Sequence, residues 1–187
     1  MKYNANDLIN ALKSLKEMKV LLIGETIIDE YYYCKGMGKI PKDNLVATKY
    51  LNHETFAGGV LACANHLAGF CDNIHLVTAL GKKNSYEDFI KDKLKPNVNF
   101  KFFYDETGQT IVKRRFIDPT FFTKMFEIYY FDDRNLPKNV SCEIIDYLEN
   151  ILPRYDLVLV NDYGHGFFDK NIIGILRKKA KFLAVNT

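Results

Sequence analysis

Short, almost wholly apolar runs alternate along this chain with segments in which apolar residues recur every three or four positions. A strand buried on both faces reads as a continuous apolar run, whereas a helix that covers a sheet shows the second pattern. The alternation predicts an α/β fold with a doubly wound, mainly parallel sheet. The predicted strands are residues 20–23, 74–80, 156–160 and 182–185. The predicted helices begin near residues 7, 60, 85, 141 and 169, and four of them have the predicted caps Asn6, Ser85, Ser141 and Asp169.

Two further stretches have a different pattern. Residues 31–56 and 98–131 are rich in Tyr, Val and Thr, alternate partially, and are interrupted by Gly and Pro. Such segments are typical of antiparallel strands. We expect them to leave the main sheet.

Polar residues follow the predicted strands or precede a predicted helix at three places. These are Asp29 after the first strand, Gly58 and Gly59 before a helix, and Asp162 after the third strand. Ligands of open α/β sheets bind beyond the carboxyl ends of the strands, so we expect a small-ligand site where these residues gather. Two plainer interpretations remain open: Asp29 as a loop carboxylate in an N-cap or turn, and the glycine pair as an ordinary turn.

Two cations lie two positions apart in the strand-like segment 110–117. Lys113 and Arg115 therefore share one face of that strand. Together they could hold a phosphate group. Alternatively, they form the solvated face of an edge strand.

Composition narrows the class of protein. The chain has 187 residues, 48% hydrophobic and 26% charged, which fits one globular domain with a sizeable core. Its net charge of +3 comes from lysines spread along the chain, so nucleic acid is not favoured as a partner, and no apolar run suits a membrane span. Four cysteines without a C-x-x-C pair indicate reduced thiols in a cytoplasmic protein. The four histidines lack metal-ligand spacing, so we expect no metal site built from side chains.

Four pieces of the sequence, in order over nearly the whole chain, resemble the ribokinase (pfkB) family of carbohydrate kinases. The resemblance is strongest to the kinase half of the bifunctional heptose-7-phosphate kinase/adenylyltransferases, which make ADP-heptose. The pieces are Gly24-Glu25-Thr26-Ile27-Ile28-Asp29-Glu30-Tyr31, Ala57-Gly58-Gly59, Gln109-Thr110-Ile111-Val112-Lys113-Arg114-Arg115 and Asp162-Tyr163-Gly164-His165-Gly166.

The resemblance implies a Rossmann-like, ribokinase-like sheet with a small β lid, and a homodimer formed through the lid strands. Residues 1–187 would be the N-terminal portion of such a domain, with lid strands at about 31–56 and 98–131. Asp29 would hydrogen-bond sugar hydroxyls, and Gly58 and Gly59 would let the sugar approach the backbone. Lys113, with Arg115 in second place, would meet the sugar or its phosphate. Asp162 would line the cleft between sugar and nucleotide.

This sequence departs from the family pattern. Ala62 stands where family members usually have an Asn that contacts the sugar, and His165 replaces a Lys. The first difference points to a different sugar or pose. The G-A-G-D loop that supplies the family's catalytic Asp and anion hole is missing from the sequence. We therefore expect no catalytic residue in this chain and a domain truncated on its C-terminal side. ATP and Mg²⁺ are the cofactors implied for the complete kinase.

The leading hypothesis is the substrate-binding half and lid of an ATP-dependent sugar or sugar-phosphate kinase, in activated-sugar or surface-polysaccharide precursor synthesis. Two alternatives stay open. A non-catalytic, dimeric binding or assembly module would use the lid strands as its interface. Another Rossmann-type nucleotide-binding protein is less favoured, because no G-x-G-x-x-G follows the first strand.

Overall fold

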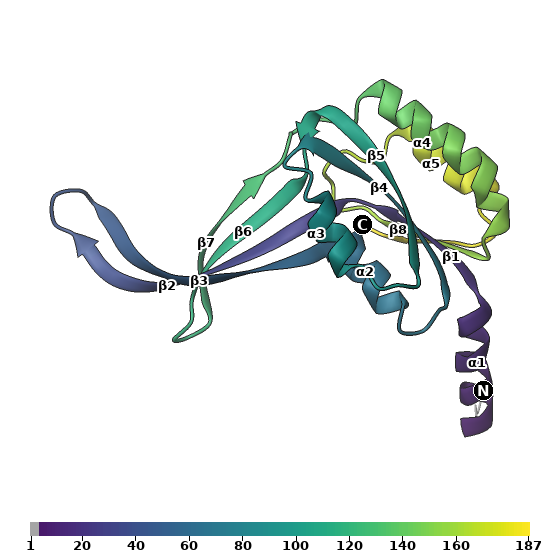
Figure 1. Cartoon of the computed structure of the whole chain (residues 1–187), viewed down its shortest axis with the longest axis horizontal. Coiled ribbons are helices and arrows are strands. Elements are labelled where there is room, and N and C mark those ends of the chain that lie inside the picture. The colour runs from purple at the N-terminus through teal and green to yellow at the C-terminus, as the bar shows by residue number, and fades with distance from the viewer. Residues whose placement is uncertain (1–3) are drawn as a thin grey trace.

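The computed structural model of this chain describes residues 4–187 and shows a main sheet flanked by helices, from which a second sheet projects (Figure 1). The main sheet has five strands in the order β5-β4-β1-β8-β9, and all neighbouring strands are parallel. The predicted parallel, doubly wound sheet is confirmed. Its strands are β1 (Lys19–Gly24), β4 (Asn73–Lys83), β5 (Val98–Gln109), β8 (Leu157–Asn161) and β9 (Leu183–Asn186).

Helices cover both faces of this sheet and divide the core into two layers. On one face α4 and α5 pack against Leu21 and Ile23 of β1, and on the other α2 and α3 pack against Val20 and Leu22. Each of these four side chains is fully buried, which stabilises the fold by about 1.5–3 kcal/mol per residue. We call the main sheet with its helices the body. The helices are α1 (Ala5–Glu17), α2 (Val60–Leu67), α3 (Glu87–Lys93), α4 (Lys138–Ile151), a 3₁₀ turn (Leu152–Arg154) and α5 (Lys170–Lys179).

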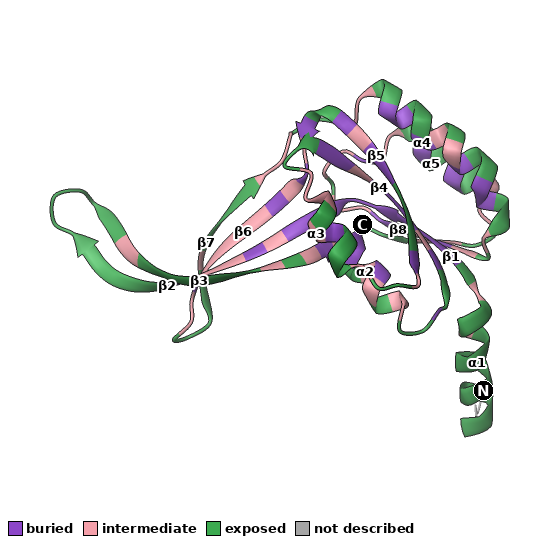
Figure 2. Ribbon diagram, viewed as in Figure 1, coloured by how far each residue is buried: buried purple, intermediate pink, exposed green. Residues whose placement is uncertain are grey.

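The second sheet, which we call the lid, has four strands in the order β3-β2-β6-β7. Strand β2 pairs antiparallel with β3 and parallel with β6, and β7 pairs antiparallel with β6. The outer half of the long β2–β3 hairpin is exposed (Figure 2). A small β lid is thus confirmed. Its strands are β2 (Thr26–Ile40), β3 (Leu45–Gly59), β6 (Ile111–Asp118) and β7 (Thr123–Tyr130).

Residues 98–109, which the sequence pattern assigns to the lid, lie instead in the main sheet as β5. This strand pairs in parallel with β4 from Val98 to Asp105 and again, after a register shift, at Gln109. Its consecutive residues Phe102 and Phe103 point to opposite faces and are both buried, one in each layer of the core. Because β5 is an edge strand, its other positions can be polar, and those polar positions gave the segment its alternating pattern.

Asp29 lies within β2 and not in a loop. Only Glu25 separates the end of β1 from the start of β2. The β2 backbone is paired with β3 on one side, where Asp29 faces Phe56, and with β6 on the other, where it faces Lys113. A strand paired on both sides leaves no room for a turn. The interpretation of Asp29 as an N-cap or turn carboxylate is therefore wrong.

Asp169 caps α5 as predicted and also ties α5 to α4. Its Oδ1 accepts hydrogen bonds from the backbone N–H groups of Asn171 and Ile172, at 2.8 Å each. Ser141 does not cap a helix: it lies inside α4, and its hydroxyl donates to Asp169 Oδ2 at 2.5 Å. The other two predicted caps are displaced by one or two residues, since α1 follows Asn4 and not Asn6, and α3 follows Tyr86 and not Ser85.

We expect Asp169→Ala to lower the free energy of unfolding by about 1–2 kcal/mol at pH 7, because three donors lose their acceptor. Burial alone would raise the pKa of Asp169, but hydrogen bonds from Ser141, Ile172 and Asn171 lower it below its ordinary value. The carboxylate therefore stabilises the fold above the unfolded pKa of about 3.9, and this contribution disappears as the pH falls through the folded pKa. Urea titrations at pH 7 and pH 3 measure both values.

Asp146→Ala is the matched control, since Asp146 is exposed on α4. It should change stability by less than about 0.5 kcal/mol. An equal loss in the two variants, or a loss that does not shrink at pH 3, would contradict the cap assignment.

Candidate functional site

The carboxylate of Asp29 lies against the backbone of Gly58, where the lid joins the body. A Cβ atom on Gly58 would come within 1.8 Å of Asp29 Oδ2, so only glycine leaves room for the carboxylate. Gly59 precedes α2 with a φ of +57°, and a Cβ atom there would lie 2.5 Å from the carbonyl oxygen of Glu25. The glycine pair is therefore a strand-to-helix junction that the packing of this chain requires, and not an ordinary turn.

Lys113 and Arg115 share one face of β6, as the spacing predicts. Arg115 forms an ion pair with Asp29 of the neighbouring strand β2 and a second, at 3.1 Å, with Glu127 Oε2 of β7. The Lys113 Nζ atom lies 5.0 Å from the centre of the Tyr129 ring. Because β6 is flanked by two strands and the Arg115 side chain is only 15% exposed, the solvated-edge interpretation is wrong.

Glu25 holds the loop that follows β8. Its carboxylate is buried and accepts backbone N–H hydrogen bonds from Tyr163 at 2.5 Å, His165 at 2.7 Å and Phe167 at 3.3 Å. Burial raises the pKa of Glu25, and the three hydrogen bonds offset part of that rise. The sequence pattern gave Glu25 no role, although a carboxylate directly after a buried strand is an unusual choice and could have drawn attention.

The loop that Glu25 holds carries Asp162 and His165. Asp162 is half-buried, and its Oδ1 accepts a hydrogen bond from the N–H of Gly164 at 2.9 Å. The imidazole of His165 lies against the ring of Phe131, and its Nε2 is buried with no hydrogen-bond partner among residues 4–187. Burial and the nearby Lys113 lower the pKa of His165. The imidazole is therefore neutral at pH 7, unlike the lysine it replaces in the resemblance.

Tyr163 brings this loop close to α2. Its hydroxyl lies 3.9 Å from Cys63 Sγ of α2. Burial, followed by the neighbouring Cys63, Asp29 and Glu25, raises the pKa of Tyr163 to about 12. The structure thus brings together the three polar groups predicted to meet, namely Asp29, the glycine pair and the Asp162 loop, at one end of β1 and β8.

A hollow of about 400 Å³ opens beside Asp29. This volume lies in the range of small-molecule pockets. Three aromatic side chains form part of its wall, and Ala62 on α2 leaves the space where an Asn side chain is usual in the resembled family. The residues that line it are Asp29, Tyr31, Tyr33, Phe56, Ala57, Gly58 and Ala62.

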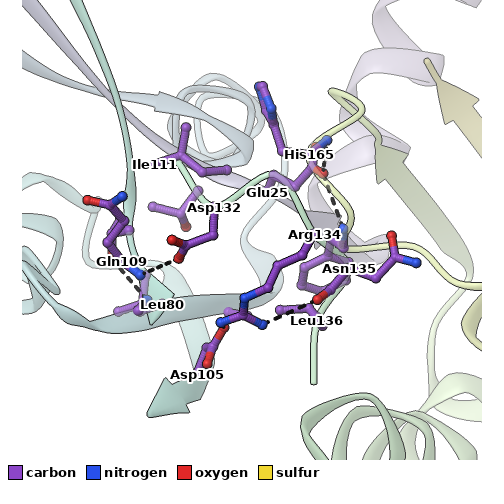
Figure 3. Close-up of a pocket in the computed structure, with 15 residues that line it drawn as sticks. Glu25, Leu80, Asp105, Gln109, Ile111, Asp132, Arg134, Asn135, Leu136 and His165 are labelled. Carbon is purple, nitrogen blue, oxygen red and sulfur yellow. Dashed lines mark hydrogen bonds and ion pairs between the residues drawn. The ribbon is translucent and has the colours of Figure 1, made fainter. Parts of the chain in front are cut away.

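A second cavity, of about 60 Å³, lies between the ends of β4 and β5 and the segment 132–136 (Figure 3). Its charged groups are already paired: Arg134 contacts Asp105 at 2.6 Å, and Asp132 accepts the N–H of Gln109 at 2.9 Å. The volume suits a few water molecules and not a sugar. None of the residues predicted to bind ligand lines it.

Residues 4–187 contain no group of three or more His, Cys, Asp or Glu side chains placed to hold a metal ion. In the same part of the chain, no helix has both the length and the apolar character needed to span a bilayer.

Comparison with curated proteins finds sequence similarity to one kind of protein. The chain is 26% identical over 168 residues to the bifunctional protein HldE of Haemophilus influenzae (strain ATCC 51907 / DSM 11121 / KW20 / Rd), which covers 87% of the chain and 34% of that protein. It is 22% identical over 174 residues to HldE of Campylobacter fetus subsp. fetus, with 90% and 37% covered. The chain thus spans about a third of the length of these relatives. No family model matches it.

Comparison with solved structures finds the same fold in carbohydrate kinases. A tetrameric, inhibited form of phosphofructokinase-2 from Escherichia coli superposes with a TM-score of 0.62 at 12% identity, covering 90% of the chain and 54% of that structure. A carbohydrate kinase from Agrobacterium tumefaciens superposes with a TM-score of 0.54 at 15% identity, covering 90% and 53%. The resemblance predicted from the sequence is thereby confirmed: the chain is similar in sequence to HldE and shares the fold of solved carbohydrate kinases.

Proposed function

We propose that this chain is the substrate-binding part, with its lid, of an ATP-dependent kinase that acts on a sugar or a sugar phosphate. The observation that carries the proposal is the position of Asp29, whose carboxylate lies on the bare backbone of Gly58 beside a hollow of about 400 Å³. A carboxylate is a strong acceptor for sugar hydroxyls, and glycine lets a ligand come close to the backbone. The similarity to HldE and to solved carbohydrate kinases supports the proposal.

Each site residue has a role in this proposal. Asp29 accepts sugar hydroxyls, and Gly58 and Gly59 bind the sugar through their backbone, with Gly58 lining the hollow. Lys113 meets the sugar or its phosphate, since no carboxylate among residues 4–187 lies within 4.0 Å of its amine, whereas Arg115 is held by two carboxylates. Asp162 lines the cleft between the sugar and the nucleotide.

ATP and Mg²⁺ belong to the complete kinase in this proposal, and we assign neither to residues of this chain. Phosphoryl transfer needs a positioned base and charge stabilisation of the transferred group. The buried carboxylate of Glu25 already accepts three backbone N–H groups, so its oxygens do not suit a Mg²⁺ ion. The product would enter activated-sugar or surface-polysaccharide precursor synthesis, as the resemblance implies. Four free cysteines fit a cytoplasmic setting.

A second candidate, a dimeric binding or assembly module, is favoured by apolar side chains exposed on the lid. Met37, Val46, Phe121 and Phe122 are 69–80% exposed, at the ends of the two lid hairpins. Exposed apolar groups of this size commonly mark an interaction surface. We propose that the lid strands form a homodimer interface, and this is compatible with either function.

Val46→Lys should shift the chain from dimer to monomer in sedimentation-velocity experiments, because a charge would have to be buried in the lid interface. Phe182→Lys is the matched control, since Phe182 is similarly exposed but lies on the body. A wild-type chain that sediments as a monomer, or an equal effect of both variants, would contradict the interface.

Sugar binding by the wild-type chain should appear as a rise in melting temperature in a panel of sugars and sugar phosphates that includes heptose 7-phosphate. Asp29→Asn should weaken that binding by roughly 10–100-fold, because hydrogen bonds to a charged acceptor are lost. Asp43→Asn, in the exposed turn between β2 and β3, is the control and should bind as the wild type does.

Two outcomes would count against this function. If no sugar raises the melting temperature, the substrate-binding role is wrong, and a dimer without sugar affinity favours the assembly module. If the chain alone forms ADP from Mg-ATP in the presence of a sugar, our assignment of no catalytic residue is wrong.

Gly58→Ala should destabilise the fold by about 1–3 kcal/mol, because its methyl group would overlap Asp29 Oδ2. The double variant with Asp29→Ala should lose less than the sum of the two single changes, since the overlap is removed. Gly174→Ala, where nothing lies within 4 Å, should stabilise α5 by up to about 1 kcal/mol. Additive losses in urea titrations would show that Gly58 does not make room for the carboxylate.

A further inference from the structure

Arg115 is shared between two carboxylates from different strands. In the β6–β7 ladder Arg115 lies directly opposite Glu127, and in the neighbouring β2 strand Asp29 lies opposite Lys113, two residues from Arg115 on the same face. The guanidinium uses Nη1 for Asp29 and Nε for Glu127, 3.1 Å from its Oε2. Among residues 4–187 no hydrogen bond from Nη2 is found, and the guanidinium carbon lies 5.3 Å from the centre of the Tyr31 ring. This nitrogen can still donate to a ligand.

Glu127 is fixed in place by a second interaction. Its Oε1 accepts a hydrogen bond from the hydroxyl of Tyr129 at 2.6 Å, while Oε2 faces Arg115. The hydrogen bond from Tyr129, together with Arg115, lowers the pKa of Glu127. Glu127 is therefore charged at pH 7 and oriented toward the guanidinium.

The charges around Asp29, which lines the hollow, favour a neutral ligand. Asp29, Arg115 and Glu127 together have a net charge of −1, and Lys113 brings the sum only to zero. An anion beside Arg115 would meet two carboxylates at short range. A hydroxyl group, in contrast, can donate to Asp29 and accept from Nη2 of Arg115 at the same time.

We propose that Glu127 is a specificity-determining residue, which by pairing with Arg115 reserves the Asp29 side of the hollow for a neutral, hydroxyl-bearing group and disfavours phosphate there. This inference rests on the proposed function for the substrate class, and it deepens that proposal. A phosphate carried by the substrate would then meet the Lys113 amine on its Tyr129 side, over β7.

The test titrates the full chain with inorganic phosphate at constant ionic strength. Binding is measured from the shift of the NMR signal of the Arg115 Nε–H. Glu127→Gln keeps an acceptor for Tyr129 but removes the charge. It should bind phosphate about fivefold more tightly than the wild type, the upper range for a partly exposed ion pair. Adding Arg115→Gln to this variant should return phosphate affinity, then measured from melting temperature, to the wild-type level.

Glu54→Gln is the matched control. Glu54 on β3 accepts a hydrogen bond from the hydroxyl of Tyr33 at 2.6 Å, as Glu127 accepts one from Tyr129, but no arginine among residues 4–187 pairs with it. Glu54→Gln removes one negative charge, as Glu127→Gln does, and should leave phosphate affinity within twofold of the wild type. An equal gain in Glu54→Gln and Glu127→Gln would mean a general charge effect, and no gain in Glu127→Gln would likewise overturn the proposal.

A parallel titration with sugars separates this proposal from the proposed function. Glu127→Gln should shift the preference of the chain from neutral sugars toward sugar phosphates. If no sugar binds to either protein, the kinase assignment fails, while the phosphate titration still decides whether Glu127 excludes anions from Arg115.

Discussion

The body and the lid meet at Glu25, the single residue between β1 and β2, and the geometry of the site depends on how its buried carboxylate is satisfied. A buried carboxylate without partners would be strongly unfavourable. Here three backbone N–H groups of the segment 163–167 surround it. The same contacts fix the loop that bears Asp162 and His165. One local requirement therefore sets the distance between the end of β8 and the start of the lid.

Because β2 begins directly after Glu25, the lid extends from the body without a flexible connection. Four residues into β2, Asp29 already lies on the cleft face of the lid, where bare backbone at Gly58 receives its carboxylate. The neighbouring strand β6 supplies Lys113, directly opposite Asp29, and Arg115, two residues further along. The charge balance of the cleft thus follows from strand register, with carboxylates and cations placed across neighbouring strands.

Much of this fold could be predicted from local patterns. The apolar run of residues 20–23 and the helical spacing around Ile144 and Leu148 each point to one structure, because burial on a sheet imposes its period on the sequence. The sheet to which β5 belongs was not predicted correctly, because only part of this edge strand is buried and its pattern matches that of a lid strand. Ser141 was predicted wrongly as a helix cap for another reason: its hydroxyl donates to Asp169, which is 28 residues away.

The sequence by itself determined the alternation of strands and helices, the lid, and the short list of polar residues that follow the strands. Those features depend on near neighbours and on periodicity. Only the tertiary structure decided that Arg115 is held by Asp29 and Glu127, that Gly58 makes room for a carboxylate, and that Glu25 clamps a loop about 140 residues away. Such contacts arise from pairing between strands distant in the sequence, and nothing in the spacing of neighbouring residues encodes which partner each charge will meet.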